Sequence, residues 1–588
     1  MRKSPIALAF VLVAASLFGF TRPAAAFESY IYGTAYDANT LVPLANVCVV
    51  LGPALVNCVA HTDANGKYFV QFPDNDAITA DQELHFLNRA AGYQDFNSPH
   101  FKVQGATFEP APMLMVGANP PPVCDTPGTP TKSIYLPNIT RFLGGPTGWY
   151  TPFIVQNTGT AATVLEVSFY KFTDGSLIVC RKIGNVLPGT SFADVPNNDL
   201  DLPFDSQFAV VVRSFGSTAV SVVNEHGGSG VRAEAMSYDG ASAGATSVFL
   251  PNITRRFFGF DTPFIIQNLG TAATSATARF VSFDGSVPTV TSLRTIDPGR
   301  SQFIDPNYEP GLVDGHQYAV TVTSPVQPIS VVVNTQDDQP TSAAPKAYST
   351  NGIIGGASTL YGSYASKHAA GIDRSATIVV QNMGTTPAAP AITFTPLGGG
   401  TPQGFVMAAI QPGGSGVFDM RYTNGDTLQP FCSGQLAGCL ADGEYSFTVA
   451  ALAASLAAQV NVISPATAMG YTASATPSTK VWLPNTTRTL GGATGWTTPV
   501  IVQGVSATSV TLSWYRFSDG ALITTQTLAF TQLGMALRVD PRDVVQLSDN
   551  TQYAVVAVGN GGTIVAIVTE LNFQGGDGAM IYEGFSAP

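Results

Sequence analysis

The chain has 588 residues, of which 45% are hydrophobic and 11% charged, and it contains 58 glycines and 41 prolines. This length exceeds what one hydrophobic core holds and predicts about four to six domains, while few charges and many turn-forming residues favour short strands over helices. A formal net charge of −12 argues against nucleic acid and anionic membranes as partners, because both are bound mainly through Lys and Arg.

The N-terminus has the pattern of a secretory signal peptide over residues 1–26. Arg2 and Lys3 precede an apolar stretch at 6–20, and Ala24-Ala25-Ala26 supplies the small residues of a cleavage site. Loss of this segment removes three basic residues and no acidic one, so the formal net charge falls from −12 to −15. We expect a secreted, extracellular or cell-surface protein with no membrane insertion after signal removal.

Six cysteines in an exported protein predict disulfides. Three pairs are expected: Cys48 with Cys58, Cys432 with Cys439, and Cys124 with Cys180. The first pair flanks two apolar runs, as a bridge across a hairpin would, and the second would close a short loop. The third pair is what remains, and other connectivities stay open because six cysteines can pair in many ways.

The segment 29–116 alternates apolar residues with Gly, Asn and Asp turns, which predicts short strands. It is similar to the carboxypeptidase regulatory-like domain. The matching residues are Gly33, Asp37, Pro43-Leu44, Thr62-Asp63, Gly66-Lys67-Tyr68 and Gly92-Tyr93. The resemblance implies a seven-stranded, prealbumin-like β-sandwich over 27–116 that has no catalytic residues and serves as a spacer or weak binding module.

A proline-rich linker at 117–132, GANPPPVCDTPGTPTK, is followed by four copies of one module. The clearest shared stretch is YLPNITRFLGGPTGWYTPFIVQN from Tyr135, which returns as FLPNITRRFFGFDTPFIIQN from Phe249 and as WLPNTTRTLGGATGWTTPVIVQG from Trp482. The third copy keeps the ending QN at Asn382. Repeated sequence at this spacing predicts a repeated fold.

Further landmarks recur in every copy. An aspartate follows the fourth strand, at Asp194, Asp305, Asp419 and Asp540. An aromatic residue then opens an apolar strand, at Phe208, Tyr318, Tyr445 and Tyr553. A tyrosine recurs near the end, at Tyr238, Tyr348, Tyr471 and Tyr582. The third copy carries an insertion before its aromatic residue, and Cys432 and Cys439 lie in it.

Each copy has about seven short runs of alternating apolar and polar residues, which predicts an antiparallel β-sandwich of immunoglobulin-like type. Leu-Pro-Asn is expected to end an edge strand, where the missing N–H of proline is tolerated. The chain is thus predicted to be all-β and elongated, with tandem immunoglobulin-like and prealbumin-like β-sandwich domains. The predicted segments are the signal peptide 1–26, the first domain 27–116, the linker 117–132, and repeats at 133–245, 246–357, 358–478 and 479–588.

The four repeats resemble the tandem repeats of large exported bacterial surface proteins. The shared motifs are FYKFTDGS, VLPGTS, SVVNE and SYDG in the first copy, VSFDGS, IDPGRS and VVVN in the second, and WYRFSDGA and VTE in the fourth. The third copy departs most, with TPLGGG in place of the Asp-Gly turn. The resemblance implies an exported surface protein and carries no catalytic or ligand residue over to this chain.

No residue pattern predicts catalysis, a cofactor or a metal. The six histidines do not recur at one repeat position, and none lies near a predicted nucleophile. The recurrent aspartates are interpreted as Asx-type turns, because one acid per copy is too few for a hard cation. DANGK at 63–67 is interpreted as a hairpin turn, and Asp199, Asp201 and Asp205 as a weak calcium candidate.

Aromatic residues after the Gly-Gly turn are the best binding candidate. Trp149, Tyr150 and Trp496 occupy this place in the first and fourth copies, and Phe258 and Phe260 lie nearby in the second. Exposed aromatic rings stack on sugar rings, so a carbohydrate platform is one interpretation. The other is a loop whose aromatic side chains fold over the end of the sandwich.

Asn138, Asn252 and Asn485 lie in N-x-Thr sequons, which accept glycans in some secreted proteins. The repeat alone explains their recurrence, and the bacterial character of the chain argues against modification.

We therefore expect a non-enzymatic secreted or cell-surface modular protein that acts in adhesion, spacing or carbohydrate binding. The expected partner is a polysaccharide or surface glycan, or another extracellular protein. The alternative is a secreted enzyme, or the accessory part of a polysaccharide- or protein-degrading system, with a site around 432–442 in the third copy.

Overall fold

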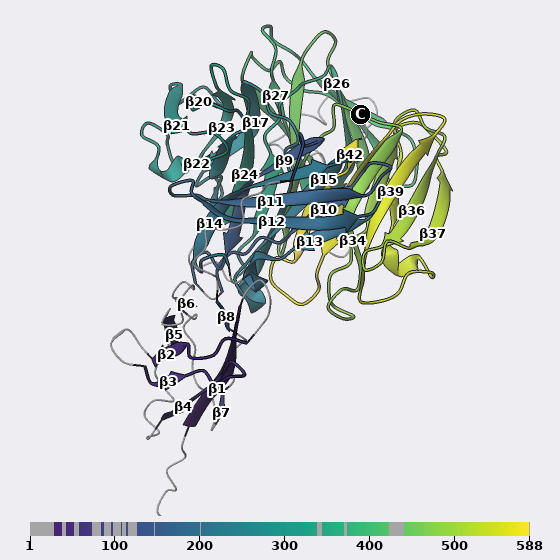
Figure 1. The fold of residues 1–588 in the computed structure, drawn as a ribbon. Helices are drawn as coiled ribbons and strands as arrows, with labels where there is room; N and C mark the ends of the chain where they lie inside the picture. The colour runs from purple at the N-terminus through teal and green to yellow at the C-terminus, as the bar shows by residue number, and fades with distance from the viewer. Residues whose placement is uncertain are drawn as a thin grey trace, which may run out of the picture. The chain divides into compact units, whose positions relative to one another are not determined.

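The computed structural model describes residues 29–37, 43–51 and 58–72, four short strands up to residue 115, and residues 126–586 apart from 146, 200, 338–343, 370–372 and 423–439. The predicted signal peptide lies outside these residues. The chain divides into two compact units, Met1–Pro120 and Pro121–Pro588. Both are built from strands (Figure 1), which confirms the predicted all-β class of tandem β-sandwich domains.

The first unit contains two small sheets. Its strands are β1 (Ser29–Asp37), β2 (Cys48–Leu51), β3 (Ala60–His61), β4 (Lys67–Phe72), β5 (Leu84–Leu87), β6 (Phe96–Asn97), β7 (Thr107–Phe108) and β8 (Met113–Met115). One sheet has the order β3-β2-β5-β6, and in the other β4 pairs antiparallel and β7 and β8 pair parallel with β1. Eight strands are thus described where the family resemblance implied seven, and the resemblance itself is not confirmed.

The DANGK turn of this unit is present, but it is not a hairpin. The Asp63 carboxylate accepts the backbone N–H groups of Asn65 (2.8 Å) and Lys67 (2.9 Å). The turn leads from β3 to β4, which belong to different sheets. It therefore crosses between the two sheets, and its aspartate oxygen is engaged by the backbone.

The second unit contains four modules, each a sandwich of two antiparallel sheets. The first module comprises β9 (Lys132–Arg141), β10 (Phe153–Asn157), β11 (Thr163–Lys171), β12 (Leu177–Val186), β13 (Ser191–Asp194), β14 (Ser206–Phe215), β15 (Ala219–Gly227) and β16 (Glu234–Asp239). Its opening sheet, which holds the first strand, has the order β12-β11-β14-β9; its closing sheet, which holds the last strand, has the order β13-β10-β15-β16. Eight strands divided four and four replace the seven that were predicted.

The other modules repeat this order, and the second and fourth each add one short strand to it, which makes one of their two sheets five-stranded. The second comprises β17 (Ser247–Arg255), β18 (Phe260–Asp261), β19 (Phe264–Asn268), β20 (Thr274–Ser282), β21 (Val290–Ile296), β22 (Ser301–Ile304), β23 (His316–Thr323), β24 (Ile329–Asp337) and β25 (Ala347–Asn351). The third comprises β26 (Thr359–Lys367), β27 (Ser375–Asn382), β28 (Ala391–Pro396), β29 (Gln403–Val406), β30 (Ser415–Asp419), β31 (Gly443–Ala450), β32 (Leu456–Ile463) and β33 (Ala468–Thr472). The fourth comprises β34 (Lys480–Arg488), β35 (Val500–Gly504), β36 (Ser509–Arg516), β37 (Leu522–Ala529), β38 (Ala536–Val539), β39 (Thr551–Asn560), β40 (Ile564–Leu571), β41 (Ala579–Glu583) and β42 (Phe585–Ser586).

Leu-Pro-Asn lies inside the first strand of a module and does not end it. The pairing of β9 with β14 shifts register between Leu136 and Ile139, and β17 and β34 shift at the same place. Proline has no N–H to donate. The bulge places it at a position that does not have to donate a backbone hydrogen bond to the neighbouring strand. The expected strand end was therefore wrong, although β9 is an edge strand as expected.

The recurrent tyrosine near the end of a module satisfies the backbone groups that this bulge leaves unpaired. The Tyr238 hydroxyl donates to the carbonyl oxygen of Asn138 (2.7 Å) and accepts its N–H (3.2 Å). The same pair of bonds recurs in the third and fourth modules. The second module differs. The strand position that faces Val223 in the first module is Tyr238, and the matching position in the second module is Thr350, so Tyr348, two residues earlier, is not the equivalent of Tyr238.

The four modules form a closed ring. The first strand of each module packs on the closing sheet of the next: β9 on β19 and β24, β17 on β27 and β32, β26 on β35 and β40, and β34 of the fourth module on β10 and β15 of the first. We call this contact a seam. A head-to-tail contact of this kind closes into a ring only when its rotation divides a full turn. The expectation of an elongated row of modules is therefore wrong for this unit.

Apolar side chains of three closing sheets, those of the first, second and fourth modules, enter the core of the preceding module. The residues that cross a seam in this way are Ile154 and Val222, Ile265 and Val332, and Ile501 and Ile567. The strands β10, β19 and β35 are consequently buried at every position, on both faces. This explains why FIVQN and its counterparts are apolar at adjacent positions instead of alternating.

The last strands of the four closing sheets meet around the ring axis. β16 packs against β25 and β41, and β33 packs against the same two strands. One repeat position on these strands holds only buried alanines, Ala235, Ala347, Ala468 and Ala579. Small side chains let the four strands approach one another at the axis.

Asp577 connects all four modules at this axis. Its N–H donates to the carbonyl oxygen of Ala233 in the first module. Its carboxylate accepts the N–H of Ala347 in the second module (2.8 Å) and of Ala468 in the third (3.1 Å). One buried side chain of the fourth module thus satisfies backbone groups of two others.

We expect Asp577→Ala to destabilise the ring, because it leaves two buried N–H groups without an acceptor. The expected loss is roughly 2–5 kcal/mol in the free energy of unfolding, measured from urea denaturation. Asp543→Ala, at an exposed site of the same module, is the control and should change it by less than about 0.5 kcal/mol. Equal stability of the two variants would show that Asp577 does not hold the modules together.

Candidate functional site

The predicted platform residues lie on the loop after the first strand. Trp149 and Leu143 exchange two backbone hydrogen bonds (2.8 and 2.9 Å), and Trp496 closes the same loop in the fourth module. Gly144 and Gly145 have positive φ angles of 91° and 102°, which favour glycine and explain the Gly-Gly pair. The loop therefore holds its tryptophan at a defined place on the module.

The three platform residues meet around the end of β15. The ring centroids of Tyr150 and His226 are 5.2 Å apart, and those of His226 and Trp496 are 5.3 Å apart. The Trp149 ring lies over Gly227, since a Cβ atom on that glycine would come within 2.7 Å of it. Because Trp496 belongs to the fourth module and the others to the first, this aromatic cluster lies at the seam between them.

The rings of the aromatic cluster are half-buried and uncharged at neutral pH. Burial lowers the pKa of His226 to about 4 and raises the pKa of Tyr150. Stacking area is thus combined with ring N–H and O–H groups, which suits a ligand that has both an apolar face and hydroxyl groups. The sequence named the three platform residues but not His226, which directly follows the SVVNE motif and contacts Trp496 of the neighbouring module.

The second module lacks this arrangement. Phe260 closes its loop by pairing with Phe257, and Phe258 in the turn between them packs on Phe257 (4.6 Å between ring centroids) and is 81% exposed. It offers a single ring to the solvent, so it is a natural control for the aromatic cluster.

Three of the four recurrent aspartates form the predicted turns. Asp305, Asp419 and Asp540 each accept the backbone N–H of the residue two positions later, at 2.9, 3.1 and 2.9 Å. Asp194 differs, because the turn after it begins at Val195, which makes no side-chain hydrogen bond, and the Asp194 carboxylate faces Arg181 at 3.7 Å.

The acidic loop of the first module is occupied by the protein's own groups. Arg181 also contacts Asp199, and Asp205 accepts the N–H of Gly144 (2.8 Å). Asp201 lies near Arg141 and opposes the burial that lowers the pKa of that guanidinium to about 10. These partners reduce the case for a calcium site here, because a hard cation needs several carboxylates directed at one point.

One histidine is in contact with a serine, but the contact belongs to a turn. His316 Nε2 lies 3.1 Å from Ser286 Oγ, and that hydroxyl donates to Asp284 at 2.7 Å. Asp174 and Ser176 make the same turn in the first module without a histidine. The geometry therefore does not mark Ser286 as a nucleophile.

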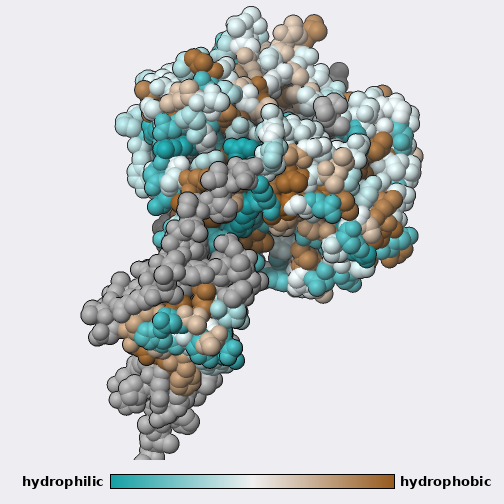
Figure 2. All heavy atoms as spheres, in the orientation of Figure 1, coloured by the Kyte–Doolittle hydropathy of each residue, from teal (hydrophilic) through white to brown (hydrophobic). Residues whose placement is uncertain are grey.

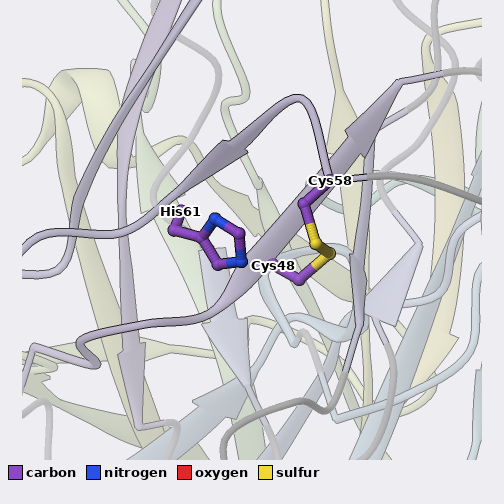
Figure 3. A group of neighbouring side chains, drawn as sticks. All are labelled: Cys48, Cys58 and His61. Atoms are coloured by element: carbon purple, nitrogen blue, oxygen red, sulfur yellow. A yellow bond between two sulfur atoms is a disulfide. The ribbon is translucent and has the colours of Figure 1, made fainter.

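The first predicted disulfide is confirmed. Cys48 and Cys58 are bonded, with Cα atoms 5.3 Å apart, and His61 lies beside them (Figure 3). Sulfur atoms joined in a disulfide are not thiolate ligands, so this group is not a metal centre. Cys180 is also disulfide-bonded. The predicted partner Cys124 and the predicted pair Cys432 and Cys439 lie outside the described residues.

The sequon asparagines are buried in the modules. Asn138, Asn252 and Asn485 are 3–5% exposed. Each accepts a hydrogen bond from a glutamine of the adjacent strand, at 2.7 to 3.0 Å. Glycan attachment to the folded module would require this strand to open.

Two seams contain a buried glutamate held by two asparagines. Glu225 accepts from Asn138 of its own module and from Asn334 of the second module, both at 3.1 Å. Glu570 is held in the same way, by one asparagine of its own module and one of the first, both at 3.0 Å. Burial raises the pKa of both carboxyl groups to about 8, although the amide donors lower it.

Because of these two glutamates, we expect the free energy of unfolding to fall as the pH rises. Their folded-state pKa lies above the ordinary value of 4.5, so between these values the folded chain keeps protons that the unfolded chain has lost. Their contribution is fully present below about pH 4 and is lost as the pH rises through 8. We expect the urea midpoint to fall from about pH 5 to about pH 8.

The double variant Glu225→Gln, Glu570→Gln should show a shallower fall, because it removes two of the titrating groups. Other buried acids, among them Asp577, keep part of the dependence. An unchanged slope would mean that these two carboxyl groups do not titrate with folding.

The face of the second unit shown in Figure 2 has no single dominant hydrophobic or hydrophilic patch. On the face of the second unit in Figure 2, hydrophobic and hydrophilic residues alternate in small areas. Exposed large hydrophobic residues such as Tyr308, Leu452 and Val545 are distributed over different modules. No helix of the described chain is long and apolar enough to cross a membrane.

Comparison with known proteins gives no family. No family model matches the chain, and no curated protein does. Among solved structures, Thermotoga maritima 1070 is 19% identical over 19% of this chain and 94% of its own, with a TM-score of 0.16. The major pilin subunit of Bacillus cereus is 8% identical over 89% and 98%, and the RrgB pilus protein of Streptococcus pneumoniae is 9% identical over 76% and 93%, both with a TM-score of 0.11. Scores this low carry no argument about function.

Proposed function

We propose that this chain is an exported, non-enzymatic binding protein of the cell surface or extracellular space, and that its aromatic cluster binds carbohydrate. One observation carries the proposal: Trp149, Tyr150 and Trp496 come from two modules and converge on His226 at one seam. A polysaccharide or surface glycan is the proposed ligand.

The chemistry of the aromatic cluster supports a sugar. The C–H face of a sugar ring stacks on aromatic rings, and its hydroxyl groups pair with donors and acceptors at the edges. His226 is neutral at neutral pH because of its lowered pKa, so it provides one donor and one acceptor nitrogen. A half-buried position fixes the rings before binding, which reduces the entropy lost on association.

Export and a binding role are supported by separate features. The signal-peptide pattern at residues 1–26 supports secretion, and the Cys48–Cys58 disulfide suits an oxidising compartment. Adhesion is compatible with the ring, whereas spacing is less favoured because a closed ring does not extend with the number of modules. The enzyme alternative depends on residues 432–442, of which the structure describes only 440–442.

The test is a glycan and polysaccharide array probed with the mature chain and with the double variant Trp149→Ala, Trp496→Ala. We expect the wild type to bind at least one glycan class. The variant should lose about tenfold or more in affinity, because the loss of each indole ring removes area on which a sugar can stack. Phe258→Ala, which removes the exposed ring of the second module, should bind as the wild type does.

Each outcome decides the proposal. Equal binding by the double variant and the wild type would place the sugar site elsewhere, and no binding to any glycan would leave adhesion to another protein as the better function. Thermal midpoints of all three proteins are needed as well, because Trp496 lies at a seam. If the double variant melts much earlier, His226→Gln repeats the test with a smaller structural change.

A further inference from the structure

A cavity opens on the ring axis at one end of the four closing strands. Its volume is about 700 Å³, within the usual range for small-molecule sites. The same segment of each module lines it, namely 239–242, 351–354, 472–475 and 583–586. This axial pocket is separate from the aromatic cluster, none of whose residues lines it.

Four equivalent side chains of these segments form a polar ring around the axis: Asp239, Asn351, Thr472 and Glu583. Asn351 is engaged by the backbone of Asp239, whose N–H it accepts (2.8 Å) and whose carbonyl oxygen it donates to (2.7 Å). Glu583 accepts the hydroxyl (2.5 Å) and the N–H of Thr472. Three of the four side chains are thus committed to partners within the ring.

The Asp239 carboxylate is the exception. No described donor bonds to it, and its Oδ1 atom is buried without a hydrogen-bond partner. Ser330 on β24 also lines the pocket, is 4% exposed, and has an Oγ atom without a partner in the described chain. Buried polar atoms without partners are rare in folded proteins and indicate a missing ligand or water.

The charge of the pocket favours a cationic group. Two carboxylates, on Asp239 and Glu583, and one lysine, Lys132, line it. Burial, together with the nearby charge of Glu583, raises the pKa of Asp239 well above its usual value. A positive charge at this place would restore the ionised form of Asp239 and supply the donors that it lacks.

The remaining wall is largely apolar. Ile353, Ile354, Phe585 and Trp482 line it together with small residues. A hydrated metal ion would gain little from such a wall, and it would find few free oxygens, since Asn351 and Glu583 already accept hydrogen bonds. An organic cation uses both the carboxylate and the apolar surface.

We propose that the axial pocket binds a primary organic amine, with its ammonium group at the Asp239 carboxylate and its hydrocarbon part against Ile353, Ile354 and Phe585. The ammonium donates to the unpartnered oxygens, and the chain displaces water from the apolar wall. The proposal does not depend on carbohydrate binding at the aromatic cluster.

The test is titration calorimetry of the full mature chain with n-hexylamine, and with n-hexanol as the neutral probe of the same shape. We expect one amine bound per chain at millimolar concentration, and hexanol to bind at least about tenfold more weakly. Binding should also release a proton near neutral pH, because Asp239 ionises on contact with ammonium. Measurement in two buffers of different ionisation enthalpy detects this release.

Two variants locate the site. Asp239→Asn keeps the size of the side chain and leaves intact the backbone bonds to Asn351, so it should fold, yet it should lose about tenfold or more in amine affinity and release no proton. Ile354→Trp should block the pocket without a change of charge, since Ile354 is 42% exposed and has room for a larger side chain. Asp174→Asn, at an exposed turn of the first module, makes the same charge change elsewhere and should leave binding unchanged.

Three results would overturn the proposal: no amine binding, equal binding of hexylamine and hexanol, or unchanged amine affinity in Asp239→Asn. Calcium binding that Asp239→Asn abolishes, in the absence of amine binding, would identify the pocket as a metal site instead.

Discussion

The ring depends on one constraint, which is that each closing sheet is apolar on both faces and must be covered on both. The opening sheet of the same module covers one face, and the first strand of the preceding module covers the other. Ile154 and Ile501, for example, lie in the cores of their neighbours. A module by itself would expose this second face to water, at roughly 25 cal/mol for each Å² of apolar surface. Closure of the ring leaves each of the four closing sheets covered.

Polar groups at the seams then fix how the modules meet. Glu225 is buried where two asparagines from two modules donate to it. A seam that slipped by two residues would bury this carboxylate without donors, which costs far more than the pair contributes when correctly formed. Apolar burial thus drives association, and the seam carboxylates and Asp577 select its register.

Local patterns were sufficient to predict the module and insufficient to predict the ring. Alternation and turn residues report on contacts within a module, and they gave the β-sandwich correctly apart from one strand. The adjacent apolar residues of FIVQN indicate a strand that is buried on both faces. No local pattern, however, predicts which surface covers the second face. For the same reason the tryptophans were recognised as a binding candidate, whereas the role of His226 depends on Trp496, which lies far away in the sequence.

Because the four modules belong to one chain, their sequences and therefore their seams can differ. The seam between the third and fourth modules is an example. Val462 occupies the place of Glu225, so the seam to the fourth module has no buried glutamate there. Instead, Arg538 and Glu444 form a bidentate pair across this seam, at 2.7 and 2.8 Å.

Sequence differences between the modules also determine which side chains meet at the ring axis. Four identical carboxylates around it would repel one another and could not all ionise. Asn351 and Thr472 in two modules limit that repulsion to the one between Asp239 and Glu583, and Asp239 is the one carboxylate of the polar ring without a described donor. Divergence between the repeats thus converts a symmetric axis into an asymmetric pocket with one acidic end.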